Sequence, residues 1–420
     1  MAHRLEPPSD PVELEHDGTR IVAQRGESIA QALLAADRLL IARGPKLHRP
    51  RGPYCLRGAC DGCLARVNGV PNVTTCRVAV RGGERVETQN VLGSRGVDLL
   101  RATDYLFPQG IDHHRLFAGI RGVSNVVSRF ARRVAGLGRL PSQVGATRPA
   151  RRRDADVLVV GAGQAGLSAA LALSGLEVLV ADDGLAPGGS LAALDPARAR
   201  HLTAEAEKCG AELSPRTTVA GLFREPEDSD SRLWALLVGS NGATLTRARA
   251  VILAPGAHDP VRAFGNDDLP GVLSARAALT LLSGGVAIGK RVAIVGGGRF
   301  ADALYDNAHL ETVRIDPDSL VRAAGRSRVS SVRVRDGQRE RKIGVDAVLI
   351  DGPGAPAFEL AVQAGASVRF DPERGYAPMV DELGVAAARV WCAGSVTGTG
   401  ADSSSAGRAV ASHVAESLRF

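Results

Sequence analysis

The strongest constraint on the fold of this chain is one run of closely spaced cysteines, YCLRGACDGCLARVNGVPNVTTC. Its thiols follow the spacing C-x4-C-x2-C-x12-C and belong to Cys55, Cys60, Cys63 and Cys76. Gaps of four and then two residues are typical of loops whose thiolates hold a [2Fe–2S] cluster. Gly58 and Gly62 allow the backbone conformations that turn amides toward cluster sulfurs, and the small Ala59 leaves room for that approach. The run therefore predicts a [2Fe–2S] site.

Two other uses of these cysteines stay open at this point. A structural zinc site usually shows two short C-x2-C pairs, and the run contains one. Structural disulfides would suit a secreted chain, but the N-terminal segment MAHRLEPPSDPVELEHDG lacks the apolar core of a signal peptide. Outside the run, Cys209 and Cys392 are expected to be buried thiols.

Length and composition indicate an α/β protein with several domains. The 420 residues can form two or three domains with cores of their own, and 45% apolar residues with 49 glycines fit a turn-rich α/β chain. The formal net charge is +7, but the arginines are scattered among 45 acidic residues, so no nucleic-acid partner is expected. No apolar run is long enough to span a membrane. Free thiols favour a reducing compartment, so we expect a cytoplasmic protein.

The N-terminal part follows the order of a β-grasp module. Residues 12–24 alternate around the turn sequence HDG, which predicts a hairpin. Glu27 and Ser28 then open an amphipathic helix, and the cysteine loop follows. We therefore place a β-grasp [2Fe–2S] domain at residues 1–92.

A connector is predicted between this domain and the rest of the chain, at residues 93–153. Its first part is irregularly helical, and its end, LPSQVGATRPARRRD, is composed like a flexible linker. The apolar, arginine-edged segment 104–137 is a plausible docking region. Its His113-His114 pair is interpreted as the polar edge of a docking helix rather than as a ligand pair.

The segment ADVLVVGAGQAGLSAALALSGLEVLVADD carries a dinucleotide fingerprint in its full context. A buried strand runs into Gly161, Gly163 and Gly166, and an Ala/Leu helix and a second strand follow. The first glycine makes the tight turn, the second lets the backbone approach a pyrophosphate, and the third packs helix on strand. Asp182 lies about 20 residues after the first glycine, where an acid takes the ribose hydroxyls. The pyrophosphate is expected at the helix N-terminus.

A second glycine cluster lies in KRVAIVGGGRFADAL. Gly296, Gly298 and Ala301 have G-x-G-x-x-A register, and Asp316 follows at the matching distance. The helix that follows is short and carries acids where packing residues are expected. Two interpretations stay open: a site for NAD or another adenine nucleotide, and a degenerate lobe that serves as scaffold. This shortened lobe is placed at residues 286–345.

Two nested nucleotide folds predict the architecture of a two-dinucleotide-binding-domain flavoprotein. The first fold is expected to occupy residues 154–285 and to resume at 346–420, with Rossmann-type parallel sheets in both lobes. Preceded by the β-grasp domain, the chain is therefore assigned to the α/β class.

Several further stretches resemble one group of flavoproteins. VILAPGAHDPVRAFGNDDLPGV (residues 251–272), RTTV (216–219) and APAFEL (355–360) are similar to segments of the alpha subunit of heterotetrameric sarcosine oxidase. They are also similar to segments of the related opine, proline and hydroxyproline dehydrogenases and hydrogen cyanide synthase. The connector DYLFPQGIDHHRLF also looks like the connection in sarcosine oxidase alpha. The cysteine module resembles the small [2Fe–2S] partner of those dehydrogenases, here fused ahead of the flavoprotein.

The resemblance implies FAD as a cofactor and assigns its site residue by residue. The fingerprint would hold the ADP half of FAD through Gly161, Gly163, Gly166 and Asp182. The loop near the flavin matches Gly188, Gly189 and Ser190. The remaining matched positions are Val219 on the adenine, Gly256 in a turn beside the cofactor, and Gly394 and Ser395 in the C-terminal flavin motif WCAGSVTG.

Three positions or segments depart from the pattern of the group. Ser395 stands where such flavoproteins usually place an Asp for the ribityl hydroxyls, so a charge-assisted contact is missing and FAD is expected to bind more loosely. Pro255, in the sequence Ala254-Pro255-Gly256, stands where the flavoproteins of this group usually have the Thr of an Ala-Thr-Gly sequence. The second lobe is shorter than in the relatives, which favours an absence of nicotinamide chemistry.

These observations favour an electron-transfer subunit. The resemblance implies an amine-oxidising, beta-type flavoprotein partner in a hetero-oligomer. Electrons from an amine or imino acid would pass between that partner, the [2Fe–2S] cluster and the FAD of this chain. No acid–base constellation or cysteine pair beside the flavin strand indicates substrate chemistry of its own, so no catalytic residue is assigned. The alternatives are a self-contained NAD(P)H-dependent reductase and a cofactor-poor assembly scaffold.

Overall fold

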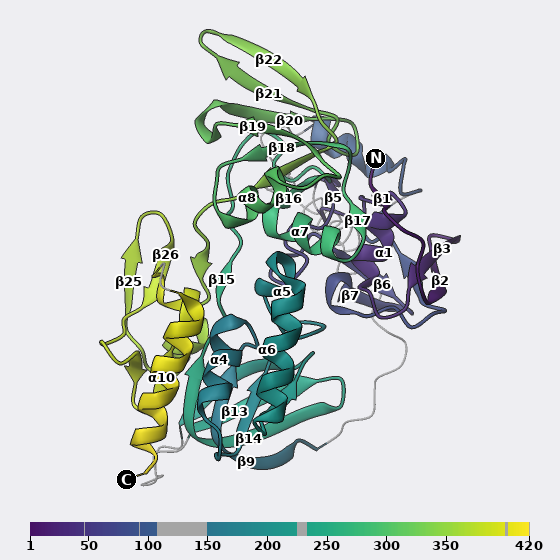
Figure 1. Ribbon diagram of the computed structural model, residues 1–420. Helices are drawn as coiled ribbons and strands as arrows, with labels where there is room; N and C mark the ends of the chain where they lie inside the picture. Colours follow the sequence, from purple (N-terminus) through teal and green to yellow (C-terminus); the bar gives the residue numbers. More distant parts are fainter. Residues whose placement is uncertain (46, 92, 107–148, 225–232, 400–401, 420) are drawn as a thin grey trace, which may run out of the picture. The chain divides into compact units, whose positions relative to one another are not determined.

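The computed structural model describes residues 1–45, 47–91, 93–106, 149–224, 233–399 and 402–419 (Figure 1). Its contacts divide the chain into two compact units. The first joins the described part of Met1–Gly145 to Val261–Asp351, and the second joins the described part of Ala146–Pro260 to that of Gly352–Phe420. The numerical bounds of the five predicted segments stay a prediction. The His113-His114 pair and nearly all of the predicted docking segment lie outside the described residues.

The N-terminal module is a five-stranded sheet with the order β3-β2-β8-β6-β7, in which only β2 and β8 pair in parallel. Its strands are β2 (Pro11–His16), β3 (Thr19–Gln24), β6 (Leu64–Val67), β7 (Val70–Thr74) and β8 (Arg85–Glu87). The predicted hairpin is confirmed, and Asp17 and Gly18 form its turn with φ angles of 49° and 77°. The smaller elements of this region are β4 (Ala42–Arg43), β5 (Pro50–Arg51), η1 (Thr75–Arg77), η2 (Leu99–Arg101) and α2 (Ala102–Leu106).

The predicted helix of this module is α1 (Ile29–Ala35). The hydroxyl of Ser28 caps it by accepting a hydrogen bond from the amide of Gln31 over 3.1 Å. Leu33 and Ile29 are fully buried beneath the sheet together with Leu14. Helical spacing of apolar residues therefore gives this small domain its core.

The second lobe of the first unit is a parallel sheet with the order β16-β23-β18-β19. These strands are β16 (Val272–Ser274), β23 (Ala347–Ile350), β18 (Arg291–Val295) and β19 (Glu311–Ile315). An antiparallel sheet flanks them, made of β20 (Leu320–Ala324), β21 (Ser331–Asp336) and β22 (Arg339–Gly344). The other elements are α7 (Ala275–Ser283), α8 (Arg299–Tyr305), η3 (Pro317–Ser319), and β17 (Val286–Ala287), which pairs with β1 (His3–Arg4) of the N-terminal module.

The second unit is built on an eight-stranded sheet. The order is β11-β10-β9-β14-β13-β12, with β28 paired to β14 and β27 paired to β28. The strands are β9 (Arg151–Val160), β10 (Val178–Ala181), β11 (Glu212–Ser214), β12 (Thr218–Arg224), β13 (Leu233–Gly239), β14 (Gly242–Leu253), β27 (Val385–Ala387) and β28 (Val390–Cys392). Strands β9, β10, β11, β14 and β28 pair in parallel, as the fingerprint predicts.

Helices cover this sheet and complete the unit. They are α4 (Gln164–Ala172), α5 (Leu191–Leu194), α6 (Pro196–Lys208), α9 (Glu359–Gln363), η4 (Gly394–Thr397) and α10 (Ser403–Ser417). Two small antiparallel pairs join β15 (Ala257–His258) to β24 (Ala355–Pro356) and β25 (Val368–Asp371) to β26 (Gly375–Pro378).

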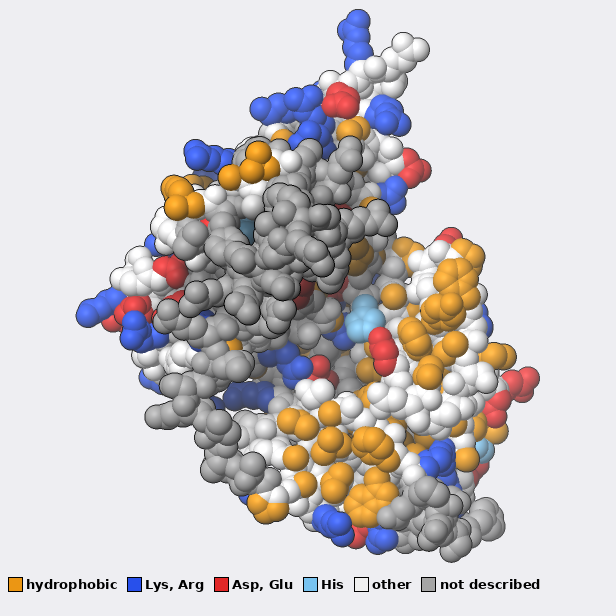
Figure 2. Space-filling model, turned by 180° about the vertical axis from the view of Figure 1, so that it is seen from behind, with side chains coloured by type: hydrophobic (Ala, Val, Ile, Leu, Met, Phe, Trp, Pro, Cys, Tyr) orange, Lys and Arg blue, Asp and Glu red, His pale blue; other side chains and the backbone are white. Residues whose placement is uncertain are grey.

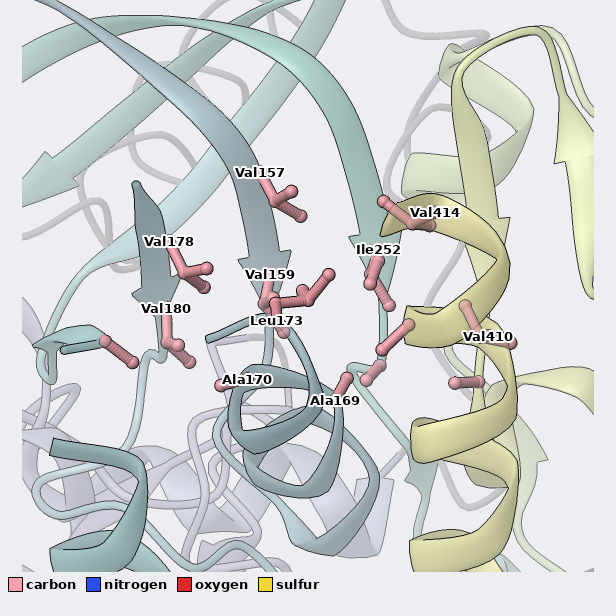
Figure 3. Close-up of a cluster of buried hydrophobic side chains, with 14 of the residues drawn as sticks. Val157, Val159, Ala169, Ala170, Leu173, Val178, Val180, Ile252, Val410 and Val414 are labelled. Atoms are coloured by element: carbon pink, nitrogen blue, oxygen red, sulfur yellow. The ribbon is translucent and has the colours of Figure 1, made fainter. Parts of the chain in front are cut away.

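Apolar side chains of β9, β10 and β14 pack against α4 and α10 in one core (Figure 3). Val157, Val159 and Ile252 point from the strands toward Leu173, which caps the C-terminus of α4, and Val414 of α10, and all of them are fully buried or nearly so. Strands buried on both faces need such continuous apolar runs. This core fixes the carboxyl edge of the sheet, where the glycine turn lies. None of the described helices is long and apolar enough to cross a membrane.

Candidate cofactor sites

The cysteine loop, residues 52–63, connects β5 to β6. Cys63 precedes β6 directly, and Cys76 lies in the single 3-10 turn η1 that follows β7. The hydroxyl of Thr75 donates to the carbonyl oxygen of Cys63 over 2.7 Å, which ties these two segments together. The hairpin of β6 and β7 therefore brings the fourth, distant thiol to the other three.

The four thiols are free and form two pairs. The sulfurs of Cys55 and Cys60 lie 3.3 Å apart, and the thiols of Cys63 and Cys76 are hydrogen-bonded to each other. A [2Fe–2S] cluster takes two protein ligands per iron, whereas a structural zinc ion needs four around one point. The arrangement in two pairs fits the cluster.

Backbone amides are directed at these sulfurs. The amide of Gly58 donates to Cys76 Sγ over 3.2 Å and that of Arg57 to Cys55 Sγ over 3.5 Å. Gly58 has a φ of +81°, a conformation that favours glycine. Gly62 is required for a different reason than expected, because its φ is not positive and a Cβ there would lie 2.2 Å from the carbonyl oxygen of Gly52.

In the metal-free chain, the hydrogen bond within each thiol pair gives the two thiols different pKa values. The hydrogen bond from Cys55 lowers the pKa of Cys60 to about 6, and the bond from Cys76 likewise lowers the pKa of Cys63. Cys55 and Cys76 are the donors of these hydrogen bonds, and their pKa values are raised by the same hydrogen bonds and by burial. One thiol in each pair is therefore predisposed to be a thiolate, which is the form that binds iron.

The second lobe supports the cysteine loop from outside the N-terminal module. The guanidinium of Arg276 donates to the carbonyl oxygen of Cys55 over 3.2 Å, and the amide of Ser274 donates to that of Tyr54 over 3.0 Å. Both donors lie at the junction of β16 and α7. Sequence reasoning missed these contacts because nothing near Arg276 marks it as a partner of a cysteine loop.

The first glycine turn has the geometry of a dinucleotide site. Gly161 has a φ of +102°, and a Cβ there would lie 2.3 Å from the carbonyl oxygen of Ala254; a Cβ on Gly166 would lie 1.9 Å from that of Gly161. In contrast, nothing lies within 4 Å of the position of a Cβ on Gly163. Gly161 and Gly166 are thus needed for close packing. Gly163 faces free space at the start of α4, where a pyrophosphate fits.

The acid and the Gly-Gly loop converge on this turn. Asp182 accepts hydrogen bonds from the amides of Ala162 and Gly184, both over 2.7 Å. Gly188 donates its amide to the carbonyl oxygen of Ala162 over 2.8 Å. A Cβ on Gly189 would lie 3.0 Å from Cα of Gly163. Ser190 follows as the residue before α5 and is partly buried.

The remaining predicted flavin positions lie on different parts of the second unit. Gly394 has a φ of +79°, and a Cβ there would lie 2.8 Å from that of Ala165 in the first turn of α4. Ser395 is partly buried in η4. Gly256 has a φ of +81° in open space, and the side chain of Val219 on β12 is buried in the core of the sheet. The structure therefore brings Gly394 to the glycine turn but places the side chain of Val219 away from free space.

The second glycine turn differs from the first. Gly296 has a φ of +88° and Gly298 one of +149°, but the carboxylate of Asp316 accepts the amides of Asp318 and Ser319 and so caps η3. Another acid, Asp351, directly follows β23 and accepts the amide of Ala301 over 2.7 Å. Sequence reasoning missed Asp351, although its place directly after an apolar strand could have drawn attention to it.

Comparisons with known proteins agree with this geometry. Residues 9–91 match the family described as 2Fe-2S iron-sulfur cluster binding domain. The chain is 28% identical over 425 residues to the alpha subunit of sarcosine oxidase from Rhizobium meliloti, across 87% of this chain and 42% of that protein. The chain is thus similar to the sarcosine oxidase alpha subunit over most of its own length. The corresponding protein from Corynebacterium sp. is 30% identical, across 66% of this chain and 27% of that protein.

Opine oxidase and a solved structure extend the comparison. An opine oxidase subunit from Agrobacterium tumefaciens is 26% identical, across 54% of this chain and 58% of that protein. The chain thus spans less than two thirds of the length of each of these relatives. Its fold matches L-proline dehydrogenase from P. horikoshii with a TM-score of 0.76 and 20% identity, over all of this chain and 76% of that one.

These findings confirm the predicted fold class, the stated resemblance and the N-terminal [2Fe–2S] domain. The open glycine turn of a flavoprotein-type fold agrees with the expected FAD. The roles of the individual site residues stay predictions. One expectation is wrong, because Cys209 is exposed at the end of α6, whereas Cys392 is buried and burial raises its thiol pKa to about 12.

Proposed function

We propose that this chain is the electron-transfer subunit of a hetero-oligomeric amine or imino-acid dehydrogenase or oxidase. Its relatives are subunits of sarcosine and opine oxidases, which supports a small secondary amine or cyclic amino acid as the substrate of the assembly. A [2Fe–2S] cluster carries single electrons and FAD carries one or two, so a chain with both sites can convert between them. Substrate oxidation itself is assigned to a partner flavoprotein.

The observation that carries this proposal is the paired arrangement of the four thiols. Two pairs of sulfurs, with amides from Gly58 and Arg57 directed at them, suit a two-iron cluster whose potential is set by hydrogen bonds to its ligands. A scaffold that had lost its cofactors would have no reason to keep this arrangement. The cysteine loop therefore favours electron transfer over the scaffold alternative.

The residues of this chain hold and insulate the proposed carriers. Cys55, Cys63 and Cys76 are nearly fully buried, while Cys60 is more open, so the cluster would be shielded on one side and accessible on the other. In the second unit, Gly163 leaves room for the pyrophosphate of FAD, and Asp182 beside it is the residue that would bind the ribose.

Exposed aromatic side chains on β25 and β26 support a partner. Phe370 is 64% exposed and Tyr376 50%, and their rings lie 5.3 Å apart between centroids. Hydrophobic side chains gather over this unit on the face shown in Figure 2. Exposed aromatic clusters of this kind mark protein–protein contacts. We assign the β25–β26 hairpin to partner docking, and the proposed docking role of 104–137 stays a separate prediction.

The test is anaerobic reduction of the complex purified from its native host. Sarcosine, proline, hydroxyproline and an opine are added in turn, and the visible absorbance of flavin and cluster is followed. We expect at least one of these amines to bleach both chromophores in the complex and none to do so in the isolated chain. NADH and NADPH are the comparison reagents: bleaching of the isolated chain by either one would instead support the self-contained reductase.

A further inference from the structure

The two glycine turns of this chain occupy the same position in their sheets. In the second unit, the amide of Ala254 donates to the carbonyl oxygen of Val160 over 2.8 Å; in the second lobe, the amide of Asp351 donates to that of Val295 over 3.0 Å. Both residues directly follow a parallel strand that pairs with the strand before the turn.

The first glycines of the turns meet these two residues in the same way. A Cβ on Gly161 would lie 2.3 Å from the carbonyl oxygen of Ala254, and a Cβ on Gly296 would lie 2.1 Å from that of Asp351. Ala254 and Asp351 are therefore structural equivalents. The first turn has a methyl group at this position, and the second turn has a carboxylate.

The side chain of Asp351 occupies the place that the first turn leaves free. Its Oδ2 accepts the amide of Ala301 over 2.7 Å and lies 3.0 Å from where a Cβ on Gly298 would be. The residue is only 7% exposed. In the first turn the equivalent side chain is the methyl group of Ala254, and the space in front of Gly163 is empty.

Two arginines influence the electrostatics near Asp351. Arg299 follows the second turn directly and its side chain is exposed; partial desolvation lowers the pKa of its guanidinium, as does the nearby charge of Arg276. The negative charge of Asp351 acts in the opposite direction and favours the charged guanidinium. The turn thus already contains a buried carboxylate, with a cationic side chain nearby.

We propose that Asp351 takes the place of a phosphate in the second glycine turn and so closes this lobe to adenine dinucleotides. A bound pyrophosphate would compete for the amide of Ala301 and would meet a buried carboxylate of like charge, which costs free energy of binding. The lobe then serves the chain through Ser274 and Arg276, which hold the cysteine loop, rather than through a nucleotide. This inference does not depend on the identity of the amine or of the partner.

The test is calorimetric titration of the FAD-saturated, cluster-loaded chain with ADP, so that the first turn is already filled. The variant D351S replaces the carboxylate with a small neutral side chain, and D318S alters an exposed acid of the same lobe whose carboxylate pairs with Arg262. We expect no measurable ADP binding to the wild-type chain or to D318S, and at least tenfold tighter binding to D351S. Binding of ADP to the wild-type chain, or none to D351S, overturns the proposal.

A reciprocal variant covers the case in which D351S does not fold, as judged by loss of cluster absorbance and of a cooperative thermal transition. A254D places a carboxylate at the equivalent position of the first turn, and A254S controls for the size of the side chain. We expect the dissociation constant of FAD to be at least tenfold higher for A254D than for A254S, with cluster absorbance unchanged in both. Equal FAD retention in A254D and A254S contradicts the proposal.

Discussion

The guanidinium of Arg276 donates a hydrogen bond to the carbonyl oxygen of Cys55 over 3.2 Å, although 221 residues separate the two in sequence. This contact places a positive charge of the second lobe beside the loop that carries the predicted cluster ligands. A cluster gains negative charge when it is reduced, so a nearby cation favours the reduced state. The second lobe thereby contributes to the redox properties of the N-terminal module without contributing a ligand.

The variant R276Q should therefore lower the reduction potential of the cluster. Glutamine keeps a donor but removes the charge, and we expect a fall of roughly 30–60 mV, since about 59 mV corresponds to a factor of ten for one electron. The measurement is a dye-mediated potentiometric titration followed by visible absorbance. The control is R262Q, because Arg262 pairs with Asp318 at the surface. An unchanged potential in R276Q would show that the contact is only structural.

The two inner glycines of the first turn should fail in different ways when replaced by alanine. A methyl group on Gly163 enters open space, so G163A should fold normally and lose FAD affinity by at least about tenfold. A methyl group on Gly166 would lie 1.9 Å from the carbonyl oxygen of Gly161, so G166A should lose about 1–3 kcal/mol of unfolding free energy. Flavin content and thermal denaturation separate the two effects. Equal thermal stability of both variants would contradict the packing argument.

The sequence predicted local features well because they depend on neighbouring residues. The hairpin at Asp17 and Gly18 and the cap of α1 by Ser28 each follow from a few adjacent residues. The order of strand, glycine turn and helix likewise determines a parallel sheet once the connections are right-handed.

The contacts that sequence could not predict join distant segments. Gly62 is needed because the carbonyl oxygen of Gly52 approaches it, not because of its own φ. Arg276 lies on α7 and Asp351 directly follows β23, and their partners are known only when the second lobe has folded. Cys209 was expected inside because cysteine is often buried, yet it ends α6 at the surface.

The thiols of the metal-free chain should differ in their reaction with iodoacetamide. The thiolate is the reactive form, and the hydrogen bond from Cys55 lowers the pKa of Cys60 to about 6. Alkylation of Cys60 should therefore rise as the pH increases through about 6 and then level off. Cys55 and Cys76, whose pKa values are raised, should stay protonated and react slowly over the same range.

This experiment is carried out in a C209A background, which removes the exposed thiol, and peptide mass spectrometry locates the label. The cluster-loaded chain is the control and should be protected at all four positions. Alkylation of Cys55 ahead of Cys60 would show that the donor and acceptor of this thiol pair are exchanged.

The aromatic pair on the β25–β26 hairpin gives a test of the proposed partner contact. Replacing both Phe370 and Tyr376 with serine removes exposed apolar rings without disturbing a buried core. We expect the amount of co-purifying amine-oxidising subunit to fall at least fivefold, with flavin and cluster absorbance of this chain unchanged. Replacing Val97, which is 63% exposed on the other unit, should leave the complex intact. Undiminished co-purification would exclude the hairpin from the interface.

Replacing Ser395 with aspartate should increase the affinity of the chain for FAD. It is partly buried in η4 next to Gly394, which approaches the first turn of α4, and the flavoproteins that this chain resembles place an aspartate at this position. A carboxylate would accept the ribityl hydroxyls in charge-assisted hydrogen bonds, which are about twice as strong as neutral ones. S395D should therefore bind FAD severalfold to about tenfold more tightly, measured by titration of the flavin-free chain. The control is S395N, because asparagine has nearly the same shape as aspartate but no charge. If S395N tightens FAD binding as much as S395D does, the size of the side chain rather than its charge limits flavin affinity in this chain.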